Sequence, residues 1–149
     1  MELDATDKAL IRRLQVDGRA SYTDLGQEVG LSGPAVRQRI QRLTDAGVMQ
    51  IAAVTDPLKT GRPVMALLGI RVDDDAAAVA AALGELDAVV YLVATAGSFD
   101  LFAEVVCATM ADLSTLINDR IRPVPGVAAI ESFPYFGIHV HRFTWGVPD

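Results

Sequence analysis

Residues 30–47 read GLSGPAVRQRIQRLTDAG, and they decide the fold of the N-terminal part of the chain. Ser32 is a residue type that often caps a helix. Three apolar residues follow at steps of four and three: Val36, Ile40 and Leu43. Steps of this size place side chains on one face of an α-helix. The stretch therefore predicts a helix that begins after Ser32, buries one apolar face and ends near Gly47.

Two shorter helices are predicted before this one. Asp4 is placed to cap a first helix that ends near Gly18. Ser21 is placed to cap a second helix that ends at Gly30. The second and third helices then meet across a tight turn, which lets the later helix enter the major groove of DNA. The sequence therefore predicts a helix-turn-helix DNA-binding domain over residues 1–50.

The outward face of the third helix is the expected DNA contact surface. Glutamine can pair with adenine, arginine can pair with guanine or a phosphate, and a helix N-terminus can bind a phosphate. A merely solvated helix face is the alternative, and the preceding helices and turn favour DNA contact over it. The expected contacts are Ser32, Pro34, Arg37, Gln38, Gln41 and Arg42. Arg39 lies nearer the apolar edge and is expected to pair with local side chains instead.

Charge is unevenly distributed along the chain. Thirteen basic and nineteen acidic side chains give a net charge of −6 at pH 7. Residues 1–50 carry equal numbers of both, so all the excess negative charge lies after residue 50. A neutral N-terminal domain with a locally basic helix can bind phosphates, whereas the acidic remainder is expected to stay away from them.

Other features of the composition limit the class of protein. The longest apolar runs, at 64–70 and 88–96, are too short to span a bilayer, and no basic segment followed by an apolar one opens the sequence. We therefore expect a soluble cytoplasmic protein with no membrane partner. Cys107 is the only cysteine, and its apolar neighbours predict a buried thiol without redox or nucleophilic chemistry.

The sequence pattern changes after the third helix. An alternating, β-branched run predicts a strand over Val48–Val54, and residues 51–63 are expected to form the connecting strand and linker of a winged-type domain. Strands are then predicted over Val64–Val72, Ala88–Ala96, Phe99–Cys107 and Val127–Phe136, and helices over Asp73–Leu86 and 109–120. This βαββαβ order predicts an α+β fold whose second domain, residues 64–149, is a ferredoxin-like sandwich.

Helices cover only one face of the sheet in such a sandwich. The other face carries Val, Leu and Phe side chains and therefore needs a partner. A two-fold homodimer is the simplest way to cover it.

The C-terminal segment 138–145 alternates like one more strand, with His139 and His141 on one face. A His-x-His pair can hold zinc or another transition metal, but no cysteine or carboxylate cluster is near in sequence. Surface or interface histidines are therefore favoured over a metal site. Phe143 and Trp145 are expected to pack on a neighbouring subunit.

Several motifs together resemble the Lrp/AsnC (feast-or-famine) regulators. They are the GLS turn at 30–32, the segment VRQRIQRLTDAGV at 36–48 and the segment GSFDLF at 97–102. The resemblance covers almost the whole chain. It implies a C-terminal RAM-type domain that dimerises, further assembly into tetramers or octamers, binding to degenerate palindromes, repression of the chain's own gene in many members, and a response to an amino acid.

The same resemblance implies where an effector would bind. The family's Gly-x-x-Asp loop lies near a subunit interface and matches Gly97 to Asp100, so the expected effector residues are Ala96, Gly97, Ser98, Phe99, Asp100 and Ser132. A structural role is the alternative, because Gly97 can simply allow a turn and Asp100 can accept hydrogen bonds from loop amides. Ile130 stands where many members have a second hydroxyl residue, which favours an apolar effector side chain.

Two other functions are compatible with this architecture. Siroheme decarboxylases resemble the same architecture without regulating DNA, but no catalytic acid pair, Ser-His-Asp set or phosphate loop is present in the sequence. A sensor that acts through protein partners is the other possibility, and Arg37, Gln38 and Gln41 argue against it. We therefore expect a regulator that is not an enzyme and needs no cofactor.

Overall fold

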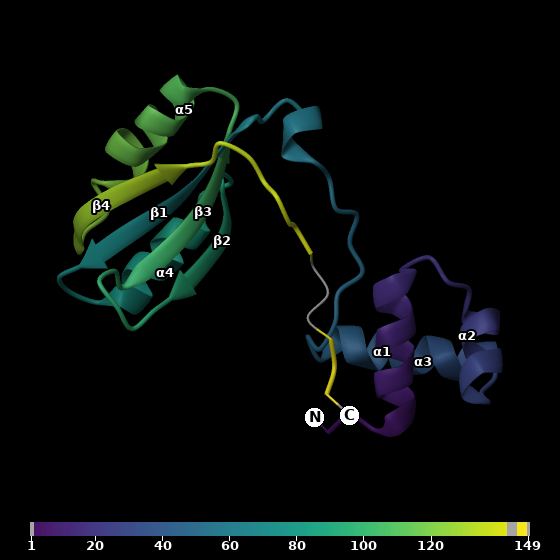
Figure 1. Ribbon diagram of the computed structural model, residues 1–149. Coiled ribbons are helices and arrows are strands. Elements are labelled where there is room, and N and C mark those ends of the chain that lie inside the picture. Colours follow the sequence, from purple (N-terminus) through teal and green to yellow (C-terminus); the bar gives the residue numbers. More distant parts are fainter. Residues whose placement is uncertain (1, 143–145, 149) are drawn as a thin grey trace. The chain divides into compact units, whose positions relative to one another are not determined.

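The structure is a computed structural model that describes residues 2–142 and 146–148, except for the side chain of Leu58. The chain divides into two compact units. One comprises Met1–Ala53 with Val140–Asp149, and the other comprises Val54–His139. Figure 1 labels the helices and strands of both units.

Three helices make up the N-terminal unit, and each begins after its predicted cap. They are α1 (Ala5–Val16), α2 (Tyr22–Val29) and α3 (Gly33–Asp45). The side chains of Asp4, Ser21 and Ser32 each accept a hydrogen bond from a backbone N–H in the first turn. Gly30 ends α2 with a φ of 70°, a left-handed conformation that favours glycine. The three helices predicted from the sequence are thus confirmed.

The apolar faces of these helices form one core. Its buried residues are Leu10, Leu14, Leu25, Val36 and Ile40. Gly26 in α2 lies so close to the Leu31 carbonyl that a side chain at this position would collide with it. The absence of a side chain therefore lets α2 approach the turn that leads into α3.

The prediction of a strand over Val48–Val54 is wrong. These residues have no regular secondary structure, and Ile51 and Val54 are exposed. A strand needs a partner for its backbone hydrogen bonds, and no described segment of this chain pairs with it. The 3-10 helix η1 (Pro57–Lys59) lies within the predicted linker.

The second unit has the predicted βαββαβ order. Its strands are β1 (Val64–Val72), β2 (Val89–Ala94), β3 (Leu101–Cys107) and β4 (Val127–Pro134). Its helices are α4 (Ala76–Gly84), α5 (Met110–Thr115) and the π-helix η2 (Leu116–Ile121). The four strands pair antiparallel in the order β2-β3-β1-β4.

Several bounds differ from those predicted. The first helix of this unit begins after Asp75, whose side chain caps it, rather than at Asp73. The last strand ends at Pro134 instead of Phe136. A proline cannot donate a ladder hydrogen bond, so it is a natural end for a strand.

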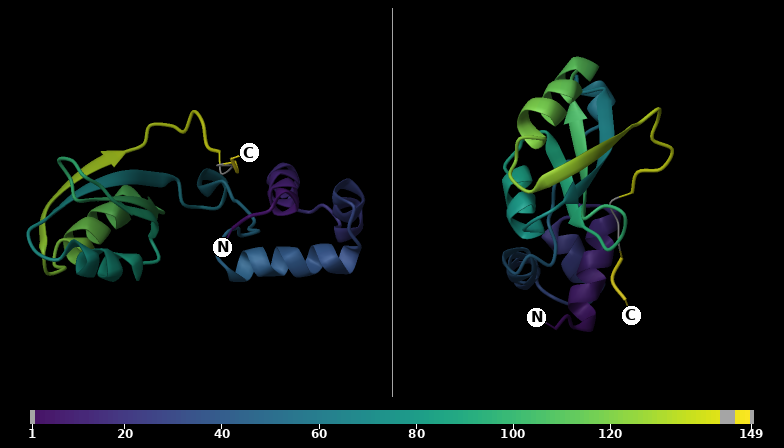
Figure 2. Two further views of the ribbon diagram at one scale, coloured as in Figure 1. Left: turned by 90° about the horizontal axis from the view of Figure 1, so that it is seen from below. Right: turned by 90° about the vertical axis from the view of Figure 1, so that its left-hand side faces the viewer.

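Helix α4 and the helical segment formed by α5 and η2 lie on the same side of the sheet, as Figures 1 and 2 show. The buried core lies between these helices and the sheet, and its largest fully buried members are Leu68, Ile70, Leu83, Leu101 and Ile121. Side chains alternate across a strand, so the neighbours of these core residues point to the other, open face of the sheet. On the open face the ring of Phe99 covers Gly69, with ring centroids 5.4 Å from Phe102 and 6.3 Å from Phe133.

The prediction of a strand over 138–145 is also wrong for residues 138–142, the part that the structure describes. Residues 138–142 have no strand structure, and both histidines are exposed. The last pairing contact is the Tyr135 N–H, which donates to the Met65 carbonyl at 2.8 Å. The predictions for Phe143 and Trp145 fall outside the described residues.

Candidate nucleic-acid interface and ligand site

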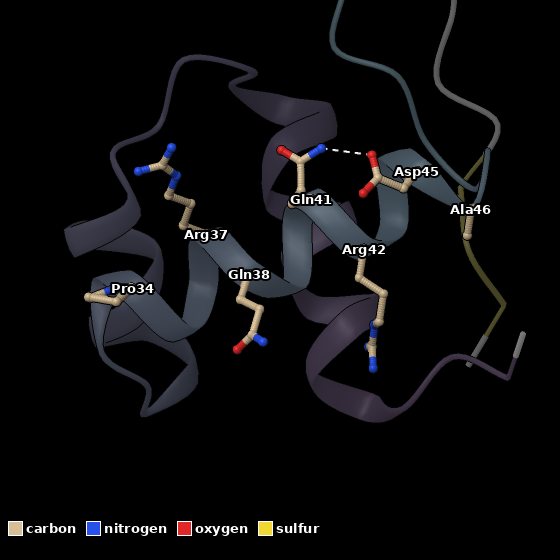
Figure 3. A pocket seen from close by; sticks show the side chains of 7 residues that line it. All are labelled: Pro34, Arg37, Gln38, Gln41, Arg42, Asp45 and Ala46. Atoms are coloured by element: carbon tan, nitrogen blue, oxygen red, sulfur yellow. Dashed lines mark hydrogen bonds between the residues drawn. The ribbon is translucent and has the colours of Figure 1, made fainter.

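A shallow groove of about 770 Å³ runs along the exposed surface of α3 (Figure 3). Its lining residues are Pro34, Arg37, Gln38, Gln41, Arg42, Asp45 and Ala46. Five of the six predicted DNA contacts therefore lie on one surface. The sixth, Ser32, caps the same helix and accepts a hydrogen bond from the Ala35 N–H.

One of the two glutamines on this surface has a fixed amide group. Gln41 Nε2 donates to Asp45 Oδ1 at 2.7 Å, one helical turn further on (Figure 3). A glutamine amide has two N–H donors and one carbonyl acceptor. The carbonyl and the second N–H of Gln41 therefore stay available to a base edge.

The arginines of α3 have different partners. Arg42 Nη2 donates to both carboxylate oxygens of Asp7, at 2.9 and 2.7 Å. Arg39 Nη1 donates to Asp7 Oδ1 at 2.7 Å and to Asp4 Oδ2 at 2.6 Å. The Asp7 side chain is 1% exposed. The local pairing expected of Arg39 is confirmed, while the ion pair of Arg42 was missed.

Arg37 differs from Arg42 in its surroundings. It makes no ion pair or hydrogen bond within the described ranges, and Figure 3 shows its side chain pointing away from that of Arg42. Nothing in the sequence distinguishes the two arginines, because the partner of Arg42 lies 35 residues earlier.

The N-terminus of α1 shows the electrostatic effect of this cluster. The Asp7 backbone N–H and the Arg39 side chain both donate to the Asp4 carboxylate and hold its pKa below the ordinary value. Asp4 and Asp7 in turn raise the pKa of Arg39. Both effects favour the charged forms of Asp4 and Arg39.

The predicted effector loop is tied to β1 by Asp100. The Asp100 carboxylate accepts a hydrogen bond from the Val72 N–H at 2.8 Å. The Asp100 N–H donates to the Ile70 carbonyl at 3.0 Å, and the Thr95 N–H donates to the Asp100 carbonyl at 2.9 Å. These contacts give Asp100 a structural role, while Ala96, Gly97 and Ser98 are exposed at the tip of the loop.

Ser132 lies in a different place from the loop. It lines a cavity of about 300 Å³ whose lining comes from α5, η2, Arg122 and β4. The other residues that line it are Met110, Leu113, Ser114, Ile117, Asn118, Ile130 and Pro134. Ser132 pairs with core residue Leu68 and points to the helix side, whereas Phe99 covers the open face. Within one chain the structure therefore does not bring Ser132 and Phe99 together.

Sequence reasoning missed Asn118 and Arg122 in this cavity. Arg122 Nε donates to Asn118 Oδ1 at 3.2 Å. The π-helix η2 carries Asn118, and Arg122 is the residue that follows it; no capping or periodicity signal in the sequence reports a π-helix.

The remaining candidates for chemistry show no assembled site. Cys107 is buried, and desolvation raises the pKa of its thiol, which disfavours the reactive thiolate. No group of three metal-ligating side chains occurs among the residues that the structure describes. Over the same ranges, no helix is long and apolar enough to span a bilayer.

Comparison with known proteins identifies both units. Residues 3–44 match the AsnC-type helix-turn-helix domain, and residues 65–144 match the Lrp/AsnC ligand binding domain. The chain belongs to the Lrp/AsnC family of transcriptional regulators.

Relatives within the Lrp/AsnC family span nearly the whole chain. The HTH-type transcriptional regulator LrpA1 of Halobacterium salinarum is 32% identical over 131 residues, 87% of this chain and 92% of that protein. The crystal structure of Mycobacterium tuberculosis leucine response regulatory protein is 29% identical, with a TM-score of 0.86 and coverage of 93% and 96%.

A second solved structure that is similar to this chain was determined with a ligand. It is the complex of the Neisseria meningitidis regulator NMB0573 with L-Met, which is 24% identical with a TM-score of 0.81 and coverage of 99% and 97%. At this identity the likeness shows the fold alone. Together the comparisons confirm the predicted family, its helix-turn-helix and its α+β ligand-binding domain, and membership of a regulator family points away from an enzyme.

Proposed function

We propose that this Lrp/AsnC regulator binds a palindromic DNA operator through α3 as a homodimer. We also propose that an amino acid bound to the second unit changes its DNA binding or its assembly. The observation that carries the proposal is the exposed surface of α3, where polar side chains of the types that read bases project from a helix braced by α1 and α2.

The DNA contacts proposed on this surface are Ser32, Pro34, Arg37, Gln38 and Gln41. Arg37 and the amides at the N-terminus of α3 are suited to phosphates, while Gln38 and Gln41 are suited to adenine edges. Because the N-terminal residues of a recognition helix reach the bases, Gln38 is the better placed of the two glutamines.

The open face of the sheet supports the homodimer. Tyr91 is 51% exposed and Phe133 is 44% exposed, and both lie on strands of this face. Large aromatic side chains exposed on one face of a sheet are covered most simply by the same face of a second copy. Further assembly into a tetramer or octamer is proposed from the family.

The effector is proposed to bind where the Ser132 cavity of one copy meets the Gly97 loop of another. In the cavity, an amino-acid carboxylate could pair with Arg122 and the Ser132 hydroxyl, beside the apolar Ile117 and Ile130. A site shared between copies explains why one chain does not bring its two parts together. The L-Met complex of the Neisseria meningitidis relative supports an amino acid as the ligand class.

A non-enzymatic role in the cytoplasm, where the DNA is, follows from this function.

A gel-shift titration tests the proposal. The full chain is titrated against the duplex upstream of its own gene at two salt concentrations, with and without a mixture of the twenty amino acids. We expect tight binding that weakens with salt and changes with the mixture. Absence of DNA binding under every condition would refute the proposal and favour the protein-partner sensor, whereas binding that ignores the mixture would refute its effector part.

A further inference from the structure

The two arginines that flank the outward face of α3 are not equivalent. Arg37 and Arg42 are five residues apart, so their side chains project about 140° from each other around the helix. Arg42 projects toward α1, where it binds Asp7, and Arg37 projects to the opposite flank (Figure 3). Counting every arginine of α3 as a possible DNA contact therefore overstates the positive charge available to DNA, because Arg42 is already paired with Asp7.

The Asp7 carboxylate depends on Arg42 for compensation. Asp7 is the only buried charged residue in the described ranges, with 1% of its side chain exposed. Its Oδ1 atom accepts from both Arg39 and Arg42, but the close guanidinium contact of Oδ2, at 2.7 Å, comes from Arg42 alone. Removing one partner of a buried ion pair is costly because the other charge stays buried without compensation. A DNA phosphate that withdrew Arg42 would leave Asp7 Oδ2 without its guanidinium partner, while Arg39 kept its contact with Oδ1, so the withdrawal would meet part of that cost.

Asp7 also couples two helices. It lies in the first turn of α1, and its two arginine partners are three residues apart on α3. Two contacts from one carboxylate to neighbouring turns restrict both the sliding and the rotation of α3 against α1. The direction in which Gln38 and Arg37 project is thereby set.

We propose that Asp7 is a positioning residue of the DNA interface that holds Arg42 as its counter-ion and keeps it from DNA phosphates, leaving Arg37 as the phosphate contact of α3. This inference rests on the proposed DNA binding. It assigns to Arg42 a role different from the phosphate contact expected from the sequence.

The test is the salt dependence of binding to a mixed-sequence duplex of about 30 base pairs, where phosphate contacts dominate. Log K falls linearly with log salt, and each phosphate contact adds about 0.9 to the magnitude of this slope, which is the quantity compared between variants. The full chain is compared with Arg37→Gln, Arg42→Gln, Asp7→Asn and the double variant Asp7→Asn/Arg42→Gln. Asp17→Asn is the matched control, because it removes one negative charge from the same unit while its side-chain oxygen can still accept the Arg19 N–H.

We expect Arg37→Gln to lower the slope by about 0.9 and Arg42→Gln to leave it unchanged. Asp7→Asn should raise the slope by about 0.9, because it releases Arg42, and the double variant should return it to the wild-type value. Asp17→Asn should not change it. Circular dichroism checks that each variant is folded at the assay temperature. Should Arg42→Gln alone fail to fold, the double variant removes the buried Asp7 charge together with its half-exposed partner.

Two results distinguish failure of the Asp7 inference from failure of the proposed DNA binding. The inference is overturned if Asp7→Asn leaves the slope unchanged and removing Arg42 lowers it. This holds whether Arg42 is removed from the wild-type chain or from the Asp7→Asn variant, since either result would mean that Arg42 already contacts phosphate. If the wild-type chain shows no salt-dependent binding, the proposed DNA binding fails, and the inference fails with it.

Discussion

Replacing Asp100 by alanine should destabilise the second unit, because it removes the acceptor of the Val72 N–H. An unsatisfied backbone donor costs about 1–3 kcal/mol when buried. This contact is only partly buried, so we expect a loss of about 1–2 kcal/mol. Asp100→Asn keeps an oxygen acceptor without the charge and should cost about half as much.

Urea denaturation followed by circular dichroism measures this loss. The same variants, titrated against DNA with and without the amino-acid mixture, separate structure from effector contact. If Asp100 only ties the loop to β1, Asp100→Asn keeps the effector response. Wild-type stability in Asp100→Ala would refute the reasoning from the Val72 contact, and a lost response in a stable Asp100→Asn would show that the carboxylate binds the effector.

Three further predictions follow from single contacts. Ser32→Ala removes the side-chain cap of α3 and should cost about 1 kcal/mol in thermal unfolding, together with weaker DNA binding in the gel shift. Phe133→Ser puts a polar group on the open face and should convert the dimer to monomer in sedimentation velocity, and an unchanged dimer would place the interface elsewhere. Burial and the hydrogen bond to Glu104 raise the pKa of Tyr135 from 10.0 to about 12. Because the pKa is raised on folding, protonated Tyr135 stabilises the folded state below pH 10, and this contribution is lost as the pH rises to 12. Ultraviolet titration should therefore show one tyrosine that ionises at higher pH than the others, and Tyr135→Phe should abolish that transition.

The helices of the N-terminal unit were predictable from sequence because their signals are local. Ser32 and Gly30 act on their own helix ends, and Val36, Ile40 and Leu43 lie within two turns of one helix. All three apolar residues are buried as their spacing predicts.

The two strand predictions that were wrong lack such a local cause. Alternation over Val48–Val54 and 138–145 reports side-chain pattern, but a strand also needs a neighbour for its backbone, and none is provided by the described part of this chain. Residues 64–72 form a strand because β3 and β4 pair with them on both sides.

The candidate site was predictable in its position but not in its ion pairs. Ser132 and Phe99 were grouped from the family resemblance, and only the strand register shows that they lie on opposite faces of the sheet of one chain. The pairing of Asp7 with Arg42 joins residues 35 positions apart, and no local pattern predicts it.

Selection of bound duplexes from a random DNA library tests the central claim most directly. The wild-type chain and Gln38→Ala are each used to select, and the enriched sequences are compared. The account predicts a palindromic preference in the wild type and loss of the preference at one position in each half-site in the variant. Absence of enrichment by the wild-type chain, or an identical preference in both proteins, would contradict recognition of DNA by this face of α3.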